Sequence, residues 1–282
     1  MTRAPVAWVL NLDAERELEN PRHTPSRSLA RAMGAARERL SAALPPGDVV
    51  LDLDPDEHAR GLAGRCFCPT PSALARLERA GAEVPEAPAP EVLARVNERG
   101  FAFALHHLEG AVRCTGEDEV GRTIARPGRW LLKRAFGFAG RGQRKIDAGE
   151  ASENDRAWIR ASLRRGALYV EPRVDIALEV ALHGMLAEDG ACERGAPTVQ
   201  LTAGGAWSES RRAAPGELSA HELARLEEAF ARVARALYEA GYFGPFGIDA
   251  FRYRAEGGER FQPLGEINAR YTMAWGTGMG GW

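Results

Sequence analysis

Three residues near the C-terminus, Glu266, Asn268 and Arg270, have the types and the spacing to bind a metal ion and an anion. In an extended segment successive side chains point to opposite faces, so these three would share one face of a strand. Carboxylate and amide oxygens suit a hard cation such as Mg²⁺ that carries phosphate oxygens, and a guanidinium can clamp the far end of the anion. A solvent-exposed polar edge strand is the simpler interpretation. The rest of the chain decides between it and a metal-binding site.

A cluster of glycines in the middle of the chain has the composition of a phosphate-binding turn. Gly137, Gly140 and Gly142 follow a short predicted strand at 129–134. Glycines at this spacing let backbone N–H groups approach an anion closely. Four basic residues flank them: Lys133, Arg141, Arg144 and Lys145. The segment is not a Walker A loop, because no Gly-Lys-Ser/Thr closes it, and its positive charge favours phosphate binding over a plain β-hairpin tip.

An acidic residue upstream, Asp249, is predicted to join the C-terminal row. It lies in a predicted strand at 243–253, and the turn at 256–258 leads into the strand that carries Glu266 and Asn268. The two strands would therefore form an antiparallel hairpin. Directly opposed residues of such a pair lie on one face, so we expect Asp249 beside the Glu266 and Asn268 side chains.

The elements that precede these residues alternate between strand and helix. The segments 5–12 and 49–53 predict two buried strands, and 28–44 has the apolar spacing of a helix between them. This order indicates a small parallel, Rossmann-like sheet. No G-x-G-x-x-G follows a strand there, so a dinucleotide site is not indicated. The pair His106-His107 could form a site, although adjacent side chains diverge in helix and strand, which favours packing.

The longest predicted helix, at 219–240, has a structural role. Ser219 and Glu222 have the spacing of a capping box, and Gly241 supplies the stop. Its apolar residues recur at helical spacing and would face a core: Leu223, Leu226, Phe230, Val233 and Leu237.

The composition argues against two classes of partner. With 37 Lys and Arg against 39 Asp and Glu, the net charge is −2, so neither nucleic acid nor an anionic membrane surface is indicated. No apolar run approaches the roughly 18 residues that span a bilayer, and the N-terminus lacks the apolar core of a signal peptide. We therefore expect a cytoplasmic protein, whose 282 residues suffice for two or three packed subdomains.

Four features stand in a fixed order along the chain: a strand lysine with a glycine-rich turn, a Glu-Pro strand end, an acidic strand residue and Glu-x-Asn-x-Arg. Together they resemble the ATP-grasp superfamily over about 113–272. The resemblance implies an α/β (α+β) fold, with a Rossmann-like N-terminal domain followed by a two-subdomain ATP-grasp fold. The implied domains are a pre-ATP-grasp-like domain at 1–112, a small lid subdomain at 113–170 and a C-terminal subdomain with the metal site at 171–282.

The resemblance also implies how the chain would bind ATP. Lys133 would contact α- or β-phosphate oxygens. Three glycines would form the lid turn over the triphosphate: Gly137, Gly140 and Gly142. Val170 would lie at the adenine edge through its backbone, with Glu171 beside it, and Glu179 would bind the ribose hydroxyls.

At the other end of the site, the resemblance implies that Mg²⁺ or Mn²⁺ is held by Asp249, Glu266 and Asn268. Arg270 would steady the acceptor carboxylate or the acyl-phosphate, and would be catalytic together with Lys133. Phosphoryl transfer asks a protein mainly for alignment and charge neutralisation, which these groups supply.

The implied function is an ATP- and Mg²⁺-dependent ligase that joins a carboxylate to an amine or thiol through an acyl-phosphate and releases ADP and phosphate. Its partners would be small-molecule or peptide carboxylate and amine substrates, with no nucleic acid, no membrane and a homodimer left open. A kinase acting on a hydroxyl acceptor and a non-catalytic nucleotide-binding protein are the alternatives.

Two features depart from the family pattern. The family commonly carries another phosphate-binding lysine before the glycine-rich turn, and the nearest basic residues here are Arg122 and Arg126. The chain also stops at Trp282, where many relatives continue. The segment 276–282 would then be a flexible flap, a domain boundary or an oligomer contact.

Overall fold

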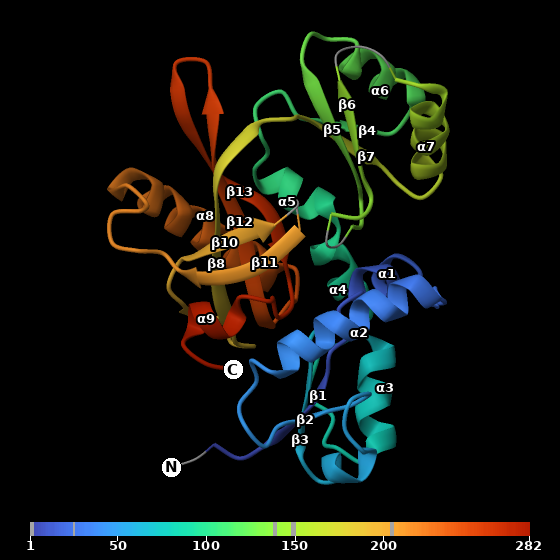
Figure 1. Ribbon diagram of the computed structural model, residues 1–282, viewed down its shortest axis with the longest axis vertical. Helices are drawn as coiled ribbons and strands as arrows, with labels where there is room; N and C mark the ends of the chain where they lie inside the picture. The colour runs from blue at the N-terminus through green and yellow to red at the C-terminus, as the bar shows by residue number, and fades with distance from the viewer. Residues whose placement is uncertain (1–2, 25, 138–139, 148–150, 204–205) are drawn as a thin grey trace.

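The structure is a computed structural model that describes residues 3–24, 26–137, 140–147, 151–203 and 206–282. The described residues form a three-stranded, a four-stranded and a six-stranded sheet, which follow one another along the chain. Figure 1 shows the first sheet in blue, the second in green and the third in yellow to red. Helices α4 (Pro90–Asn97) and α5 (Arg99–Leu105) run between the first and the second sheet.

The first sheet is parallel, with the order β2-β1-β3. Its strands are β1 (Val6–Val9), β2 (Val49–Val50) and β3 (Ala63–Cys66). Alternate residues of β1 enter two different cores, because helix α2 (Arg27–Ser41) covers one face of the sheet and α3 (Pro71–Ala80) the other. Trp8 packs with Met33 of α2, and Ala7 with Leu77 of α3. The Rossmann-like arrangement expected from the strand and helix order is therefore present.

The second sheet is antiparallel, with the order β4-β7-β5-β6. Its strands are β4 (Val112–Cys114), β5 (Arg129–Arg134), β6 (Gln143–Asp147) and β7 (Leu168–Pro172). Helices α6 (Glu117–Ile124) and α7 (Glu153–Leu163) cover one face, where Val120 and Ile159 pack against Leu132 and Ile146. The opposite face carries polar side chains, among them Lys133 and Glu171.

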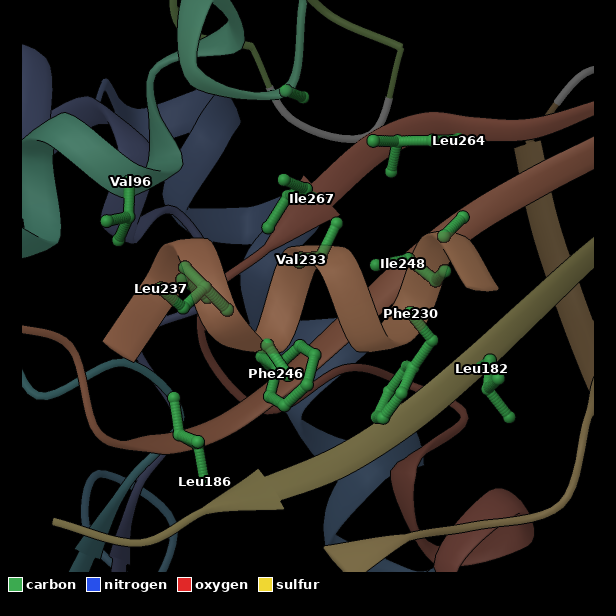
Figure 2. Close-up of a cluster of buried hydrophobic side chains, with 14 of the residues drawn as sticks. Val96, Leu182, Leu186, Phe230, Val233, Leu237, Phe246, Ile248, Leu264 and Ile267 are labelled. Carbon is green, nitrogen blue, oxygen red and sulfur yellow. The ribbon is translucent and has the colours of Figure 1, made fainter. Parts of the chain in front are cut away.

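The third sheet has the order β11-β10-β8-β12-β13, and β9 (Cys192–Arg194) pairs with β8. Its other strands are β8 (Asp175–Leu186), β10 (Thr198–Ala203), β11 (Ala206–Arg212), β12 (Gly244–Ala255) and β13 (Gly258–Asn268). One face packs against the 20-residue helix α8 (Ala220–Glu239), as Figure 2 shows for Phe230, Val233 and Leu237. Gly184 of β8 permits this contact, since a Cβ there would lie 2.4 Å from Phe230.

Helix α8 begins as the sequence predicts. The Ser219 hydroxyl accepts from the Glu222 N–H at 3.2 Å, and the Glu222 carboxylate accepts from the Ser219 N–H at 2.8 Å. The capping box is thus confirmed, and Gly241 follows the helix with a left-handed φ of 82°.

The C-terminal segment packs between the first and the third sheet. It contains the short helix α9 (Trp275–Met279), and Tyr271 and Trp282 lie against Trp8 with ring centroids 5.1 and 5.8 Å away. Trp275 is buried in the same cluster. Of the three roles expected for 276–282, the structure shows none directly, and it places the segment in an aromatic core that links two sheets.

We expect Trp282→Ala to lower the free energy of unfolding by about 2 kcal/mol, because a half-buried indole and its edge contact with Trp8 are lost. Urea unfolding of the two proteins measures the difference. Leu53→Ala, at an exposed side chain, is the control and should change stability by less than about 0.5 kcal/mol. Equal effects of the two substitutions would contradict the linking role of the aromatic cluster.

No helix among the described residues is long and apolar enough to cross a membrane. The domain boundaries expected at 1–112, 113–170 and 171–282 remain a prediction.

Candidate nucleotide and metal site

Three polar residues of the third sheet, Asp249, Glu266 and Asn268, lie on the face that α8 does not cover. In the register Asp249 lies directly opposite Glu266, and Asn268 lies opposite Gly247, two residues from Asp249 on the same strand. The alternate residues Ile248 and Ile267 point to the other face and pack with α8. The hairpin pairing therefore brings Asp249, Glu266 and Asn268 to one face, as the sequence predicts.

Asp249 is held in place by two amide side chains. Its Oδ1 accepts from Gln200 Nε2 at 2.9 Å and its Oδ2 accepts from Asn268 Nδ2 at 3.0 Å. The surrounding protein displaces most of the water near this carboxylate, and desolvation with repulsion from Glu266 raises its pKa to about 7. The sheet thus keeps a carboxylate where its negative charge is unfavourable in the absence of a cation.

This donor set fits Mg²⁺. The amide of Asn268 donates to Asp249 and leaves its Oδ1 as a ligand, next to carboxylates from Asp249 and Glu266. Mg²⁺ is commonly bound by one or two carboxylates together with phosphate oxygens and water. Among the described residues no group of three or more His, Cys, Asp and Glu could hold a metal ion. Substrate phosphate and water would have to complete the coordination, which is the usual case for Mg²⁺.

The polar face of the second sheet carries Lys133. On β5 its neighbours Trp130 and Leu132 are buried in the core, and Lys133 points to the opposite face. Its ammonium forms an ion pair with Glu171, which lies at the end of β7, and both side chains are largely buried. Lys145 of β6 stands opposite Leu131, so it lies on the same face as Lys133. Lys133 and Glu171 are thus brought together, as adjacent strand positions allow.

The glycine-rich turn joins β5 to β6. Gly140 and Gly142 have left-handed φ values of 73° and 81°, which other residues rarely adopt. A Cβ at Gly137 would lie 2.6 Å from the Arg141 carbonyl oxygen, so the turn has no room for a side chain there. The turn also includes residues 138 and 139, which lie outside the described residues. Its glycines are needed for the backbone path itself.

Two further residues predicted to contact the nucleotide, Val170 and Glu179, lie in different sheets. Val170 is buried in the centre of the second sheet, with Val112 on one neighbouring strand and Leu132 on the other. Glu179 of β8 lies opposite Gln200, on the same face as Asp249, and burial raises its pKa. Glu179 therefore lies on the same face as Asp249, whereas Val170 lies within the second sheet with its side chain in the core.

Arg270 does not continue the strand row, so the expectation that it shares a strand face with Glu266 and Asn268 is wrong, whereas its role at the acceptor stays a prediction. Strand β13 ends at Asn268, and the guanidinium of Arg270 turns toward α1 (Ala14–Glu19), where it forms an ion pair with Glu15. It also donates to the Tyr271 carbonyl oxygen at 3.0 Å and lies over the Phe67 ring. The cause is the buried Glu15 carboxylate of α1, which competes for the cation.

Arg99, a basic residue that the sequence analysis did not indicate, lies between the second and the third sheet. Its Nη2 is 3.0 Å from Glu266 Oε1, and its Nε donates to the Arg134 carbonyl oxygen at 3.2 Å. Its Nη2 would also lie 3.8 Å from a Cβ at Gly137. The guanidinium thus connects the glycine-rich turn with a predicted metal ligand. By contrast, Arg122 and Arg126 are exposed.

Arg99 could not have been found from local pattern. It is the first residue of α5, and 167 positions separate it from Glu266. Gln200 was missed for a similar reason, because its contact with Asp249 depends on the order of strands in the sheet. Both are polar residues that are partly buried, and this burial is known only from the assembled sheets.

No protein-family model matches the chain. No curated protein sequence matches it either.

Solved structures are similar to the chain in fold. N5-carboxyaminoimidazole synthetase from Staphylococcus aureus, complexed with ADP, matches 96% of this chain and 72% of its own, with a TM-score of 0.55 and 10% sequence identity. D-alanyl-alanine synthetase A from Vibrio cholerae matches 95% of this chain and 90% of its own, with a TM-score of 0.52 and 13% identity. A complex of biotin carboxylase from Campylobacter jejuni with β-γ-ATP matches 74% of this chain and 49% of its own, with a TM-score of 0.55 and 15% identity. At these identities the likeness shows the fold.

Proposed function

Because the chain has the ATP-grasp fold, α+β in class, as these solved structures do, we propose that it is an ATP- and Mg²⁺-dependent ligase. It joins a carboxylate to an amine or thiol through an acyl-phosphate and releases ADP and phosphate. Solved structures of the same fold contain ADP or an ATP-type ligand, and one of them carries the name of a D-alanyl-alanine synthetase. The acceptor acid and the amine are left to experiment.

The observation that carries the proposal is the juxtaposition at Arg99. This residue brings the glycine-rich turn of one sheet within contact of Glu266 on the other. A triphosphate requires this combination, because its charge must be met by backbone amides and cations on one side and by a metal on the other.

In the proposed mechanism Lys133 and Arg99 neutralise the phosphate oxygens, and the backbone amides around Gly137, Gly140 and Gly142 orient them. Asp249, Glu266 and Asn268 would hold Mg²⁺, which supplies charge neutralisation between the phosphates when bound. Glu171 holds Lys133 in place through their ion pair. No side chain of this set has to act as a covalent nucleophile, because the transfer requires alignment and charge neutralisation.

Arg270 would take part on the acceptor side. Its Nε and Nη2 are engaged by Glu15, and its Nη1 donates to a backbone oxygen. An acceptor carboxylate would therefore meet a guanidinium that Glu15 has already oriented, or would displace Glu15 from it. The Oε2 atom of Glu15 is buried and has no hydrogen-bond partner among the residues that the structure describes, which leaves an acceptor for an incoming ammonium or hydroxyl donor.

A carboxylate screen with hydroxylamine as surrogate nucleophile tests the function. We expect one class of acid to yield both hydroxamate and ADP in equal amounts. A phosphorylated alcohol as the stable product, without hydroxamate, would replace the ligase with a kinase. Absence of ADP with every acid, in protein that binds ATP, would favour a non-catalytic nucleotide-binding protein.

We expect Lys133→Ala to weaken ATP binding by roughly 10- to 100-fold, because a largely buried cation is lost from the phosphate end. Lys133→Arg should retain part of the affinity. Isothermal titration with a non-hydrolysable ATP analogue and Mg²⁺ measures both. The matched control is Arg160→Ala on the exposed side of α7, which removes the same charge. An unchanged affinity of Lys133→Ala would remove Lys133 from the site.

A further inference from the structure

A cavity of about 730 Å³ opens on the α8 side of the third sheet. It is bounded by the first two turns of α8, by the outer halves of β12 and β13 and by the segment that follows α5. Arg252 of β12 shows that the cavity lies on the α8 face of the sheet, because its Nε donates to Glu222 of α8 at 2.7 Å. The row of Asp249, Glu266 and Asn268 lies on the opposite face, so the cavity is separate from the proposed nucleotide site. Its volume is in the range of small-molecule sites.

The acidic residues of this cavity are already paired. Glu222 is bonded to Arg252, which also lies 3.7 Å from Glu259, and Glu109 lies 3.3 Å from Arg260. The cation that remains is Arg225 on α8, whose side chain is half-buried and has no hydrogen bond or ion pair with any other described residue. The three carboxylates and three guanidiniums that line the cavity therefore balance in charge, and Arg225 is the guanidinium that no described residue engages.

Three imidazoles also line the cavity, those of His106, His107 and His221. His106 Nδ1 lies 3.1 Å from the His107 carbonyl oxygen, and His107 Nδ1 lies 3.0 Å from the Phe103 carbonyl oxygen. Since a carbonyl oxygen only accepts, both rings carry their proton on Nδ1. Each Nε2 is then free to take up a second proton and donate it to a ligand.

We propose that this cavity binds a small dianion, a phosphate or dicarboxylate group, which ion-pairs with Arg225 and takes up protons on the histidine Nε2 atoms. An oxyanion supplies what the cavity lacks, namely acceptors for one guanidinium and for two or three ring N–H groups. It also offsets the positive neighbours of His106, since Arg225, Arg232 and His107 add to burial in lowering the pKa of that ring.

The proton uptake fixes the sign of the pH dependence. Lowering the pH favours the charged form of His106, which lies near Arg225, and should strengthen binding, whereas raising the pH should weaken it. The other charged groups around these rings are guanidiniums and carboxylates, residue classes that ordinarily titrate outside the range from pH 6 to 8. These groups are Glu109, Glu222, Arg225, Arg232, Arg252, Glu259 and Arg260.

The test uses the full chain with sulfate, which stays dianionic throughout, and with succinate as the dicarboxylate. Imidazole ¹⁵N spectra should show the signals of His106, His107 and His221 shifting with sulfate, while that of the buried His183 stays in place. We expect a Kd of about 1 mM or below at pH 6, and about tenfold weaker binding at pH 8. Whichever of sulfate and succinate binds more tightly identifies the anion class.

The deciding variant is Arg225→Gln, which should weaken sulfate binding at least tenfold. Its matched control is Arg235→Gln, which removes the same charge further along α8 and lies outside this cavity. Binding that survives Arg225→Gln, or histidine signals that do not move with either anion at about 20 mM, would overturn the proposal. Neither result depends on ATP turnover, so it leaves the proposed ligase function untouched.

Discussion

Asp249→Asn should stabilise the metal-free protein at pH 8 while lowering Mg²⁺-dependent ADP formation by roughly 10³-fold. The native carboxylate is desolvated and faces Glu266, which raises its pKa from 3.8 to about 7. At about 1.4 kcal/mol per unit, holding it ionised costs at most about 4 kcal/mol. We expect a gain of about 2 kcal/mol, because some solvent reaches the site and Asn fits the two amide donors less well.

The sign of the pH effect follows from the direction of this shift. The folded protein binds the Asp249 proton more tightly than the unfolded chain, so this residue favours folding fully below pH 3.8. That contribution is lost as the pH rises through about 7. The Asn variant has no such loss. Its advantage over the parent should therefore be small at pH 5 and largest at pH 8.

Urea unfolding at pH 5 and pH 8, in the presence of EDTA, measures the stability difference. Adding Mg²⁺ with an ATP analogue at pH 8 should raise the melting temperature of the parent and leave that of the variant unchanged. Glu256→Gln, in the exposed turn between β12 and β13, is the control for loss of one carboxylate. An Asn variant that is less stable than the parent at pH 8 would show that Asp249 is a structural residue.

Much of this fold could be predicted from local pattern. The capping box at Ser219 and the pairing of Asp249 with Glu266 depend on neighbours within about 20 positions, where spacing and turn residues determine geometry. The three-sheet arrangement also follows the strand and helix order along the chain. The ATP-grasp fold indicated by four weak motifs is confirmed by the solved structures.

The site is harder to predict from the sequence, because the residues that were not predicted come from elements far apart along the chain. Arg270 is held by Glu15, 255 positions earlier, a contact that the sequence did not indicate, and its role at an acceptor stays a prediction. Gln200 reaches Asp249 because β10 and β12 flank β8 in the third sheet. Such contacts are decided by how the sheets are assembled, which local periodicity does not encode. The roles of Val170 and Glu179 stay predictions.

Arg99→Gln is expected to raise the KM for ATP by roughly 10- to 100-fold, with a smaller effect on kcat. The guanidinium lies at the glycine-rich turn and would meet the phosphates as they bind. Arg99→Lys should recover part of the loss, since it restores the charge without the planar fork. If the substitutions only loosened the local structure, Arg99→Gln and Arg99→Lys would change kcat and KM by similar factors, and the lysine would recover nothing.

Arg122→Gln and Arg126→Gln are the matched comparisons, because these residues carry the same charge, lie in or just after α6 and are exposed. If either weakened ATP binding while Arg99→Gln did not, the second phosphate cation would belong to α6 or the turn after it.

A double-mutant cycle with Glu266→Gln separates the two roles of Arg99. Coupling of more than about 1 kcal/mol in metal binding would show that Arg99 also orients the Glu266 carboxylate. Additive losses would restrict Arg99 to the nucleotide, because the ion pair with Glu266 would then contribute nothing to metal affinity.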